Sequence, residues 1–176
     1  MKLKHLLALA TLAVLVVACG SPQPSPPNYE AIYSPAVKAY FEAWNTGDTA
    51  PLNDLFPPDF TRAARGQAGS AGNIDELKAV IEGLRAAYSD AHVSEDESYY
   101  LDGVSFHHWT FSGTNDGPLG DRPATGAHAE VSGLTMMRYA DGKPVEELVY
   151  WDDLELNQQL GFTLVPPDAG DGAPVE

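Results

Sequence analysis

The first half of the chain carries hydrophobic residues at helical spacing. Val37, Tyr40, Phe41 and Trp44 recur at i, i+3, i+4 and i+7, which is the spacing of one apolar helix face. Ser34 followed by Pro35 predicts an N-cap and a first helical position, and residues 45–47 supply a stop. The pattern therefore predicts a helix that starts after Ser34 and ends near residue 46.

Two further helices are predicted before residue 90. Residues 51–56 read as a short helix that ends at a pair of prolines. Asn73 and Glu76 have the spacing of a capping box at the start of a longer helix. The inner face of that helix is expected to consist of Leu77, Val80, Ile81, Leu84 and Tyr88.

From about residue 91 the pattern changes to that of strands. We expect strands over residues 95–101, 104–114, 128–139 and 145–151, with Asp102-Gly103 and Asp141-Gly142 as turns and a last helical segment at 154–160. Helices followed by an antiparallel meander indicate an α+β domain. The expected architecture is a helical hairpin packed in a curved, mostly antiparallel sheet, which leaves a cone-shaped pocket for a ligand.

The N-terminus has the pattern of a secretory signal. Lys2 and Lys4 precede an apolar stretch over residues 6–17, which is shorter than the roughly 20 residues of a spanning helix. The sequence Val-Val-Ala-Cys that ends at Cys19 resembles a lipobox, in which the cysteine takes a diacylglyceryl group. We expect residues 1–18 to be a lipoprotein signal peptide and Cys19 to be lipidated. The alternatives are ordinary cleavage, which leaves a free thiol, or a buried core cysteine.

This expectation also sets the domain boundaries and the location. Residues 19–33, rich in proline, read as the lipidated cysteine and a tether, and residues 164–176 as a disordered acidic tail. The folded domain is then expected over residues 34–163. The protein is expected to be exported and held in the outer membrane where the organism has one, otherwise on the outer face of the cell membrane.

Composition and charge exclude several classes of function. Loss of the signal would leave 158 residues, which suits one domain, with a net charge of −17. Such a charge repels nucleic acid, so nucleic acid is not an expected partner. One cysteine allows no internal disulfide and no thiolate metal site, and His128 with Glu130 is too small a ligand set for a metal. We therefore expect no metal and no cofactor.

Residues 34–161 resemble the SnoaL-like polyketide or ester cyclases of the nuclear transport factor 2-like superfamily. The stretches that carry the resemblance are Trp44-Asn45-Thr46-Gly47, Pro58-Asp59-Phe60, Leu84-Arg85-Ala86-Ala87-Tyr88, Trp109-Thr110-Phe111-Ser112-Gly113-Thr114, and Asp141-Gly142-Lys143 together with Gln158-Gln159-Leu160-Gly161. The resemblance implies the cone-shaped fold and its pocket. Function is a separate matter, because one fold hosts enzymes and binding proteins alike.

The resemblance also implies where catalytic residues would lie. Polyketide cyclases of this family use an aspartate on the last strand and a histidine on the neighbouring strand. Counting without gaps places the aspartate position at Val149 and the histidine position at Thr135, while Asn115 stands where a Gly-Thr-His motif has its histidine. Neither valine nor threonine exchanges a proton near neutral pH. The implied pocket therefore lacks the implied acid and base.

Three other ionisable residues are candidates for catalysis. Asp152 reads as a relocated acid/base at the pocket mouth or as the cap of the last helix. Glu147 shares a strand face with Val149, so it either enters the pocket, where apolar walls would raise its pKa, or is solvated at the strand end. His107 and His108 point to opposite faces of a strand, and His108 is the better pocket candidate because a basic residue often precedes this aromatic position in the family.

Aromatic residues predict the character of the pocket. Large flat groups and a methionine suit a small apolar or polycyclic ligand, although the same residues could fill the cone as core. The expected pocket residues are Tyr40, Phe41, Trp44, Trp109, Asn115, Thr135, Met137, Val149 and Trp151.

Three hypotheses of function follow. The first is a membrane-anchored lipoprotein that binds a small, largely apolar molecule. The second is an active cyclase, isomerase or hydrolase with a relocated acid/base. The third is a protein-interaction module that forms a homodimer through the open face of the sheet.

Overall fold

The computed structural model describes residues 25–65 and 69–163. The expected signal peptide, Cys19 and the acidic tail lie outside the described residues. Within the described ranges, the longest apolar helical stretch falls short of what crossing a membrane requires.

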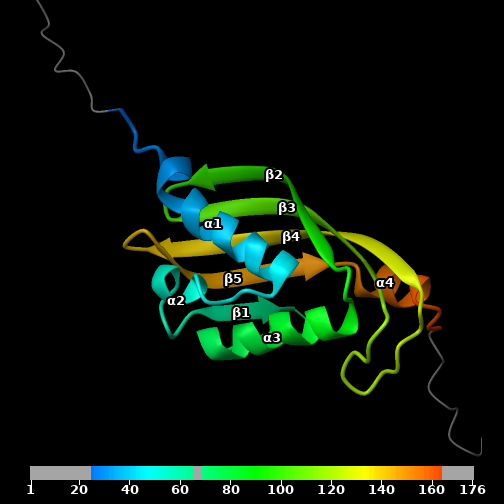
Figure 1. Cartoon of the computed structure of the whole chain (residues 1–176). Helices are drawn as coiled ribbons and strands as arrows, with labels where there is room; N and C mark the ends of the chain where they lie inside the picture. The colour runs from blue at the N-terminus through cyan, green and yellow to red at the C-terminus, as the bar shows by residue number, and fades with distance from the viewer. Residues whose placement is uncertain (1–24, 66–68, 164–176) are drawn as a thin grey trace, which may run out of the picture.

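A five-stranded curved sheet forms the body of the domain (Figure 1). Its order is β1-β5-β4-β3-β2. The strands are β1 (Thr61–Ala64), β2 (His92–Leu101), β3 (Val104–Thr114), β4 (His128–Ala140) and β5 (Lys143–Trp151). All neighbours are antiparallel except β1, which runs parallel to β5. The predicted α+β class and the four predicted strands are confirmed, whereas β1 was not predicted.

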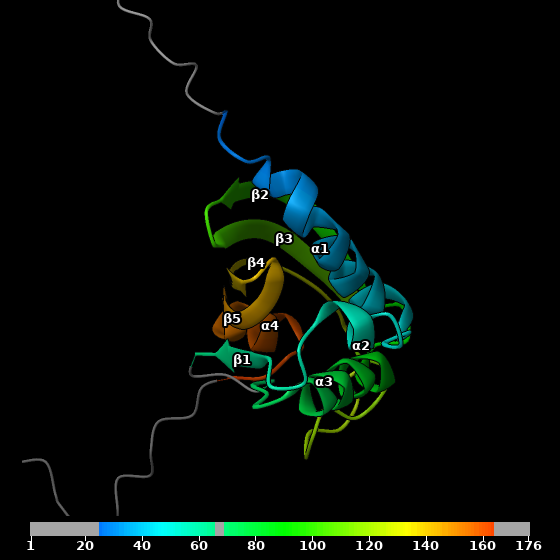
Figure 2. The same cartoon turned by 90° about the vertical axis from the view of Figure 1, so that its left-hand side faces the viewer.

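Helices cover one face of this sheet. They are α1 (Tyr29–Thr46), α2 (Leu52–Leu55), α3 (Ile74–Ala87) and α4 (Asp153–Gln159). Figure 2 shows α1, α2 and α3 on the same side of the curved sheet, and Figure 1 shows α4 beyond the end of β5. The arrangement is the predicted one, a pair of long helices held inside a bent sheet.

The predicted start of the first helix is wrong. α1 begins at Tyr29, and the side chain of Asn28 caps it by accepting a hydrogen bond from the Ala31 amide at 3.1 Å. Pro35 lies inside the helix, so residues 29–33 belong to α1 and not to the tether. Packing explains the extra turn, since the ring of Tyr33 stacks on that of Tyr139 with centroids 3.7 Å apart. This contact offsets the helical hydrogen bond that proline cannot donate.

The start of α3 follows the predicted capping box. Asn73 Oδ1 accepts a hydrogen bond from the Glu76 amide at 2.9 Å, and a Glu76 carboxylate oxygen accepts one from the Gly72 amide at 2.7 Å. Along the inner face, Leu77 and Ile81 are fully buried. The capped end therefore fixes which side of α3 faces the sheet.

The hydrophobic core is divided into two clusters. One packs α1, α2 and the first half of α3 around Tyr40, Phe60 and Met137. The other packs the end of α3 against Tyr88 and Phe111 near α4. Residues of both clusters border a common cavity, so the cone is not filled by core side chains.

Candidate ligand-binding pocket

A cavity of about 400 Å³ lies between the concave face of the sheet and helices α1 and α3. This is within the range of pockets that take small ligands. The exposed members of its lining mark the mouth, and they come from the second half of α3 and from the loop after β3: Gly83, Ala86, Pro118 and Gly120. The remaining lining is mostly apolar and aromatic.

Seven of the nine expected pocket residues line this cavity. They are Tyr40, Phe41, Trp44, Trp109, Thr135, Val149 and Trp151. Met137 and Asn115 do not line it. Met137 is fully buried in the cluster formed with α1 and α2. Met137 lies on the expected face of β4, but α1 and α2 cover that face at this position.

Asn115 fastens the loop that forms part of the mouth. Its Nδ2 donates hydrogen bonds to the Ala87 carbonyl at 3.2 Å and the Gly117 carbonyl at 2.9 Å, and its Oδ1 accepts one from the Thr125 amide at 3.0 Å. A Cβ at Gly117 would lie 1.9 Å from the Ala86 carbonyl oxygen. The loop therefore starts in close contact with the end of α3, and Asn115 has a positioning role.

The expectation for His108 is wrong. His108 lies on the outer face of β3, half exposed, with its Nδ1 3.4 Å from Asp96. Alternation along β3 turns His107 inward instead, together with Ser105 and Trp109. The family pattern identified the right segment but the wrong member of the pair of histidines.

His107 belongs to a buried polar network outside the pocket. Its Nδ1 lies 2.9 Å from Glu95 Oε1, and its Nε2 lies 2.6 Å from Ser105 Oγ. This is the connectivity of a serine-histidine-acid triad. However, Ser105 and His107 are fully buried, neither lines the cavity, and Ser105 Oγ also contacts the Tyr139 hydroxyl at 2.8 Å. A nucleophile that no substrate can reach is not catalytic, so we assign this network a structural role.

Asp152 caps α4. Its side chain accepts a hydrogen bond from the Glu155 amide at 2.9 Å, and the residue is exposed outside the cavity lining. Of the two interpretations of Asp152, the helix cap is therefore the correct one. Its neighbour Asp153 borders the pocket instead.

Glu147 lies at the polar centre of the pocket wall. It is 1% exposed, which excludes the solvated alternative. The Tyr40 hydroxyl donates to its Oε2 at 2.5 Å, and the Thr135 hydroxyl donates to its Oε1 at 3.0 Å. Arg62 completes the cluster with Nε 3.1 Å from Oε2. Both carboxylate oxygens therefore have partners from other elements.

Electrostatics favour the protonated forms of Tyr40 and Arg62. Burial, and then the charge of Glu147, raise the pKa of Tyr40 well above its ordinary value, so its hydroxyl remains a donor. Burial alone would lower the pKa of Arg62, but Glu147 and Tyr40 outweigh that effect and the pKa is raised. Arg62 is thus a charged guanidinium paired with the Glu147 side chain, as a buried ion requires.

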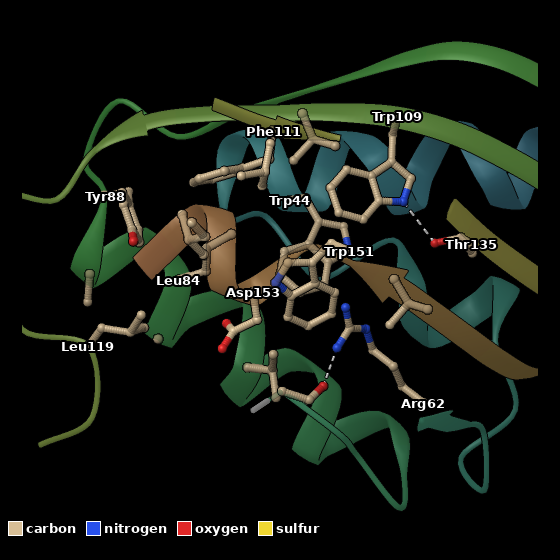
Figure 3. Close-up of a pocket in the computed structure, with 18 of the residues that line it drawn as sticks. Trp44, Arg62, Leu84, Tyr88, Trp109, Phe111, Leu119, Thr135, Trp151 and Asp153 are labelled. Atoms are coloured by element: carbon tan, nitrogen blue, oxygen red, sulfur yellow. Dashed lines mark hydrogen bonds between the residues drawn. The ribbon is translucent and has the colours of Figure 1, made fainter. Parts of the chain in front are cut away.

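Three tryptophans lie near Arg62 and Thr135 (Figure 3). The guanidinium carbon of Arg62 lies 5.2 Å from the ring centre of Trp44 and 5.9 Å from that of Trp151, within cation–π range. Trp109 Nε1 donates to Thr135 Oγ1 at 3.1 Å. A Cβ at position 133 would lie 2.2 Å from the Trp109 ring, so Gly133 allows the indole to lie across β4.

Sequence reasoning missed Arg62. Phe60, Arg62 and Ala64 alternate as buried positions, but β1 has four residues and its pattern is too short to indicate a strand. The one sign of this site in the sequence is that Arg62 stands between two apolar residues, Phe60 and Ala64, at alternating positions. Within the described ranges, no group of three or more His, Cys, Asp or Glu residues is placed to hold a metal ion.

A bent sheet closed over two helices around an apolar pocket defines the class of small cone-shaped α+β domains, which serve both catalysis and binding. Residues 34–160 match the model of the SnoaL-like polyketide cyclases. The chain belongs to this family.

Solved structures show the same fold. TsrD from Streptomyces laurentii is 23% identical, with a TM-score of 0.67 over 74% of this chain and 96% of its own. IdmH from Streptomyces antibioticus, a candidate polyketide cyclase, is 26% identical, with a TM-score of 0.63 over 73% of this chain and 98% of its own. AclR from Streptomyces galilaeus, a candidate hydroxylase, is 20% identical, with a TM-score of 0.63 over 77% and 84%. Comparison with the sequences of curated proteins finds no match.

Proposed function

We propose that this protein is a membrane-anchored member of the family that binds a small, largely apolar molecule and does not perform the family's ring closure. One observation carries the proposal. An apolar cavity of about 400 Å³ is lined by Val149 and Thr135, where the resemblance to polyketide cyclases places an aspartate and a histidine.

The three ionisable residues expected as catalytic candidates support binding over catalysis. Asp152 caps a helix and His108 lies on the outer face, so neither reaches a ligand in the cavity. Glu147 does reach it, but both of its oxygens already accept hydrogen bonds or an ion pair. To remove a proton from a ligand it would have to release one of these partners, which is costly in a buried site.

Binding is tested by titrating the domain with a hydrophobic dye and a set of polycyclic compounds. All three tryptophans line the cavity, so their emission should change saturably when it fills. Leu119→Arg places a charge in the lining and should abolish the change. Leu154→Arg, on the exposed side of α4 and outside that cavity, is the matched control and should bind like the wild type. A flat titration in the wild type with every compound would contradict the proposal.

Anchoring is supported by the lipobox-like sequence and by Cys19 being the one cysteine of the chain. In cells fed a clickable fatty acid, the wild-type protein and a Ser21→Ala control should be labelled and sediment with membranes. Cys19→Ala should be unlabelled and keep its signal peptide. Undiminished labelling of Cys19→Ala would refute the anchor without bearing on the pocket.

A further inference from the structure

A second cavity, of about 360 Å³, lies beside the pocket and is called the α4 cavity below. It is bordered by α4, by residues that follow α4 and by one residue of the loop between β3 and β4. Its lining residues are Arg122, Asp153, Leu154, Asn157, Phe162 and Thr163. Arg122 and Asp153 also line the pocket itself. These two residues therefore lie between the two cavities.

The loop between β3 and β4 carries Arg122 at its tip. Leu119 and Arg122 exchange two backbone hydrogen bonds, of 2.9 and 3.2 Å, around a turn in which Gly120 has a φ of +59°. Residues paired in this way have side chains on the same side, and both of these line the pocket. The other residues between 118 and 124 are exposed. Leu119 and Arg122 therefore provide the contacts that hold the tip against the domain.

Arg122 fastens this tip to α4. Its Nη1 donates a hydrogen bond to Asn157 Oδ1, and its guanidinium carbon lies 5.6 Å from the ring centre of Phe162. Asn157 is oriented for this contact, because its Nδ2 donates to the Asp153 carbonyl oxygen at 2.6 Å and to the Asp153 carboxylate at 2.8 Å. A continuous hydrogen-bonded bridge therefore runs from the loop to α4, through the residues that separate the two cavities.

The two sides of this bridge differ in how firmly they are held. On the α4 side, Gln159 Nε2 donates to the Glu130 carbonyl at 2.9 Å and Gln159 Oε1 accepts from the Glu130 amide at 2.8 Å, which fixes the helix on β4. The loop covers residues 115–127, and Asn115 fastens it at its base. Loops of this length often serve as lids. The tip can therefore leave α4 while both strands and the helix stay in place.

We propose that the contact between Arg122 and Asn157 is a gate between the α4 cavity and the pocket. While the contact is formed, Arg122 separates the two spaces. When it breaks, the tip of the loop carries Leu119 and Arg122 away and the two spaces join. A ligand then passes through the α4 cavity, as a second path beside the mouth at α3. The path rests on the proposed binding function, whereas the movement of the loop can be measured without a ligand.

The binding kinetics of a hydrophobic dye test the gate. Asn157→Ala removes the partner of Arg122 and leaves the lining of the pocket as it is. Loss of one hydrogen bond to a charged group should raise the open fraction, and with it the association and dissociation rates, by up to about 10-fold. Kd should stay at the wild-type value, because the gate opens in the same way with and without the dye.

Gln158→Ala, at an exposed position of the same helix, is the matched control and should keep the wild-type rates. An increase of the dissociation rate alone would show that the change acts on the bound dye and not on a gate. That result, or unchanged rates in Asn157→Ala, would overturn the proposal.

Two further variants locate the path. Phe162→Leu keeps an apolar side chain but removes the ring beside Arg122, so both rates should rise together, by a smaller factor than in Asn157→Ala. Leu154→Trp fills part of the α4 cavity, and combined with Asn157→Ala it should cancel the increase. An increase that persists in this double variant would overturn the path through the α4 cavity.

NMR relaxation dispersion measures the movement of the loop in the protein without dye. The amides of residues 118–124 should exchange with an open state whose population is about 10-fold larger in Asn157→Ala than in the wild type or Gln158→Ala. Identical profiles in the three proteins would overturn the gate whether or not a dye binds. The expected exchange in a protein that binds no dye would remove the proposed binding function and leave the movement of the loop established.

Discussion

Thr135 on β4 lies directly opposite Val149 on β5, and both side chains are buried against the same cavity. These are the positions at which the resemblance to polyketide cyclases implies a histidine and an aspartate. Cross-strand neighbours in an antiparallel pair have side chains within contact distance. The backbone thus holds the two positions as a catalytic pair would need them, with a methyl-bearing side chain at each.

Val149→Asp tests how this site treats charge. Glu147 shares its strand face two residues away, so a new carboxylate would be buried beside an existing one. We expect the variant to fold with a lower midpoint in urea and to bind apolar ligands at least about 10-fold more weakly. Val149→Asn has the shape of the aspartate variant but no charge. It should lose less stability and less ligand affinity than Val149→Asp. Equal losses in the two variants would show that shape and not charge governs the wall.

Asp152→Ala should lower stability and leave binding unchanged. Loss of a side-chain N-cap costs roughly 0.5–2 kcal/mol of unfolding free energy, while Asp152 does not line the cavity. Asp152→Asn, which can still cap, should stay close to the wild type. Chemical denaturation and ligand titration on both variants check this. A variant of normal stability that no longer binds would contradict the capping role.

Acid should weaken the fold partly through Glu95. The hydrogen bond with His107, and to a lesser extent that from Ser98, hold the pKa of Glu95 below its ordinary value although burial opposes them. The folded pKa then lies below the unfolded value of about 4.3, so this stabilisation is present above that pH and is lost as the pH falls through the folded pKa.

Urea unfolding between about pH 3 and 7 should therefore show a smaller loss of stability on acidification in Glu95→Gln than in the wild type. Glu42→Gln, at an exposed position on α1, is the matched control and should follow the wild-type profile. A Glu95→Gln profile parallel to the wild type would refute the contribution of Glu95.

The outer face of the sheet should hold a second copy of the domain. Tyr99, Phe106, Met136 and Leu148 pair in register into one apolar row across four strands, and Figure 2 shows α1, α2 and α3 on the opposite side. We expect a dimer in sedimentation equilibrium. Met136→Lys should shift it to monomer, whereas Ser132→Lys, on the same strand face away from the row, should not. A wild-type domain that stays monomeric at high concentration would exclude this partner.

Long periodic segments made most of the fold predictable. The apolar stripe on α1, the capping box of α3 and the two Asp-Gly turns each follow from neighbouring residues alone. β1 could not be predicted, since a four-residue strand is defined by its pairing with β5 and not by a pattern of its own. The extra first turn of α1 depends in the same way on Tyr139, which is distant in sequence.

The pocket walls were more predictable than its polar centre. Strand alternation and helical spacing suffice to place aromatic residues on an inner face. The partners of Glu147 come from α1, β1 and β4, so no local pattern reveals that Tyr40, Arg62 and Thr135 meet there. Likewise, which of His107 and His108 faces inward depends on strand pairing across the whole sheet.

The direction of α1 has a consequence for how a ligand would arrive. Its 18 residues extend for about 27 Å. Tyr33, near its start, lies at the β2–β3 turn, where its hydroxyl accepts a hydrogen bond from the Gly103 amide at 3.2 Å. Its last turn lies beside Arg85, in the half of α3 that borders the mouth (Figure 1).

The chain therefore enters the domain at one end and the cavity opens toward the other. With an anchor at Cys19, the attachment point and the opening would lie at opposite ends of the domain. A ligand that arrives through the aqueous compartment, or is handed over by another protein, would then meet an opening that the attachment does not cover.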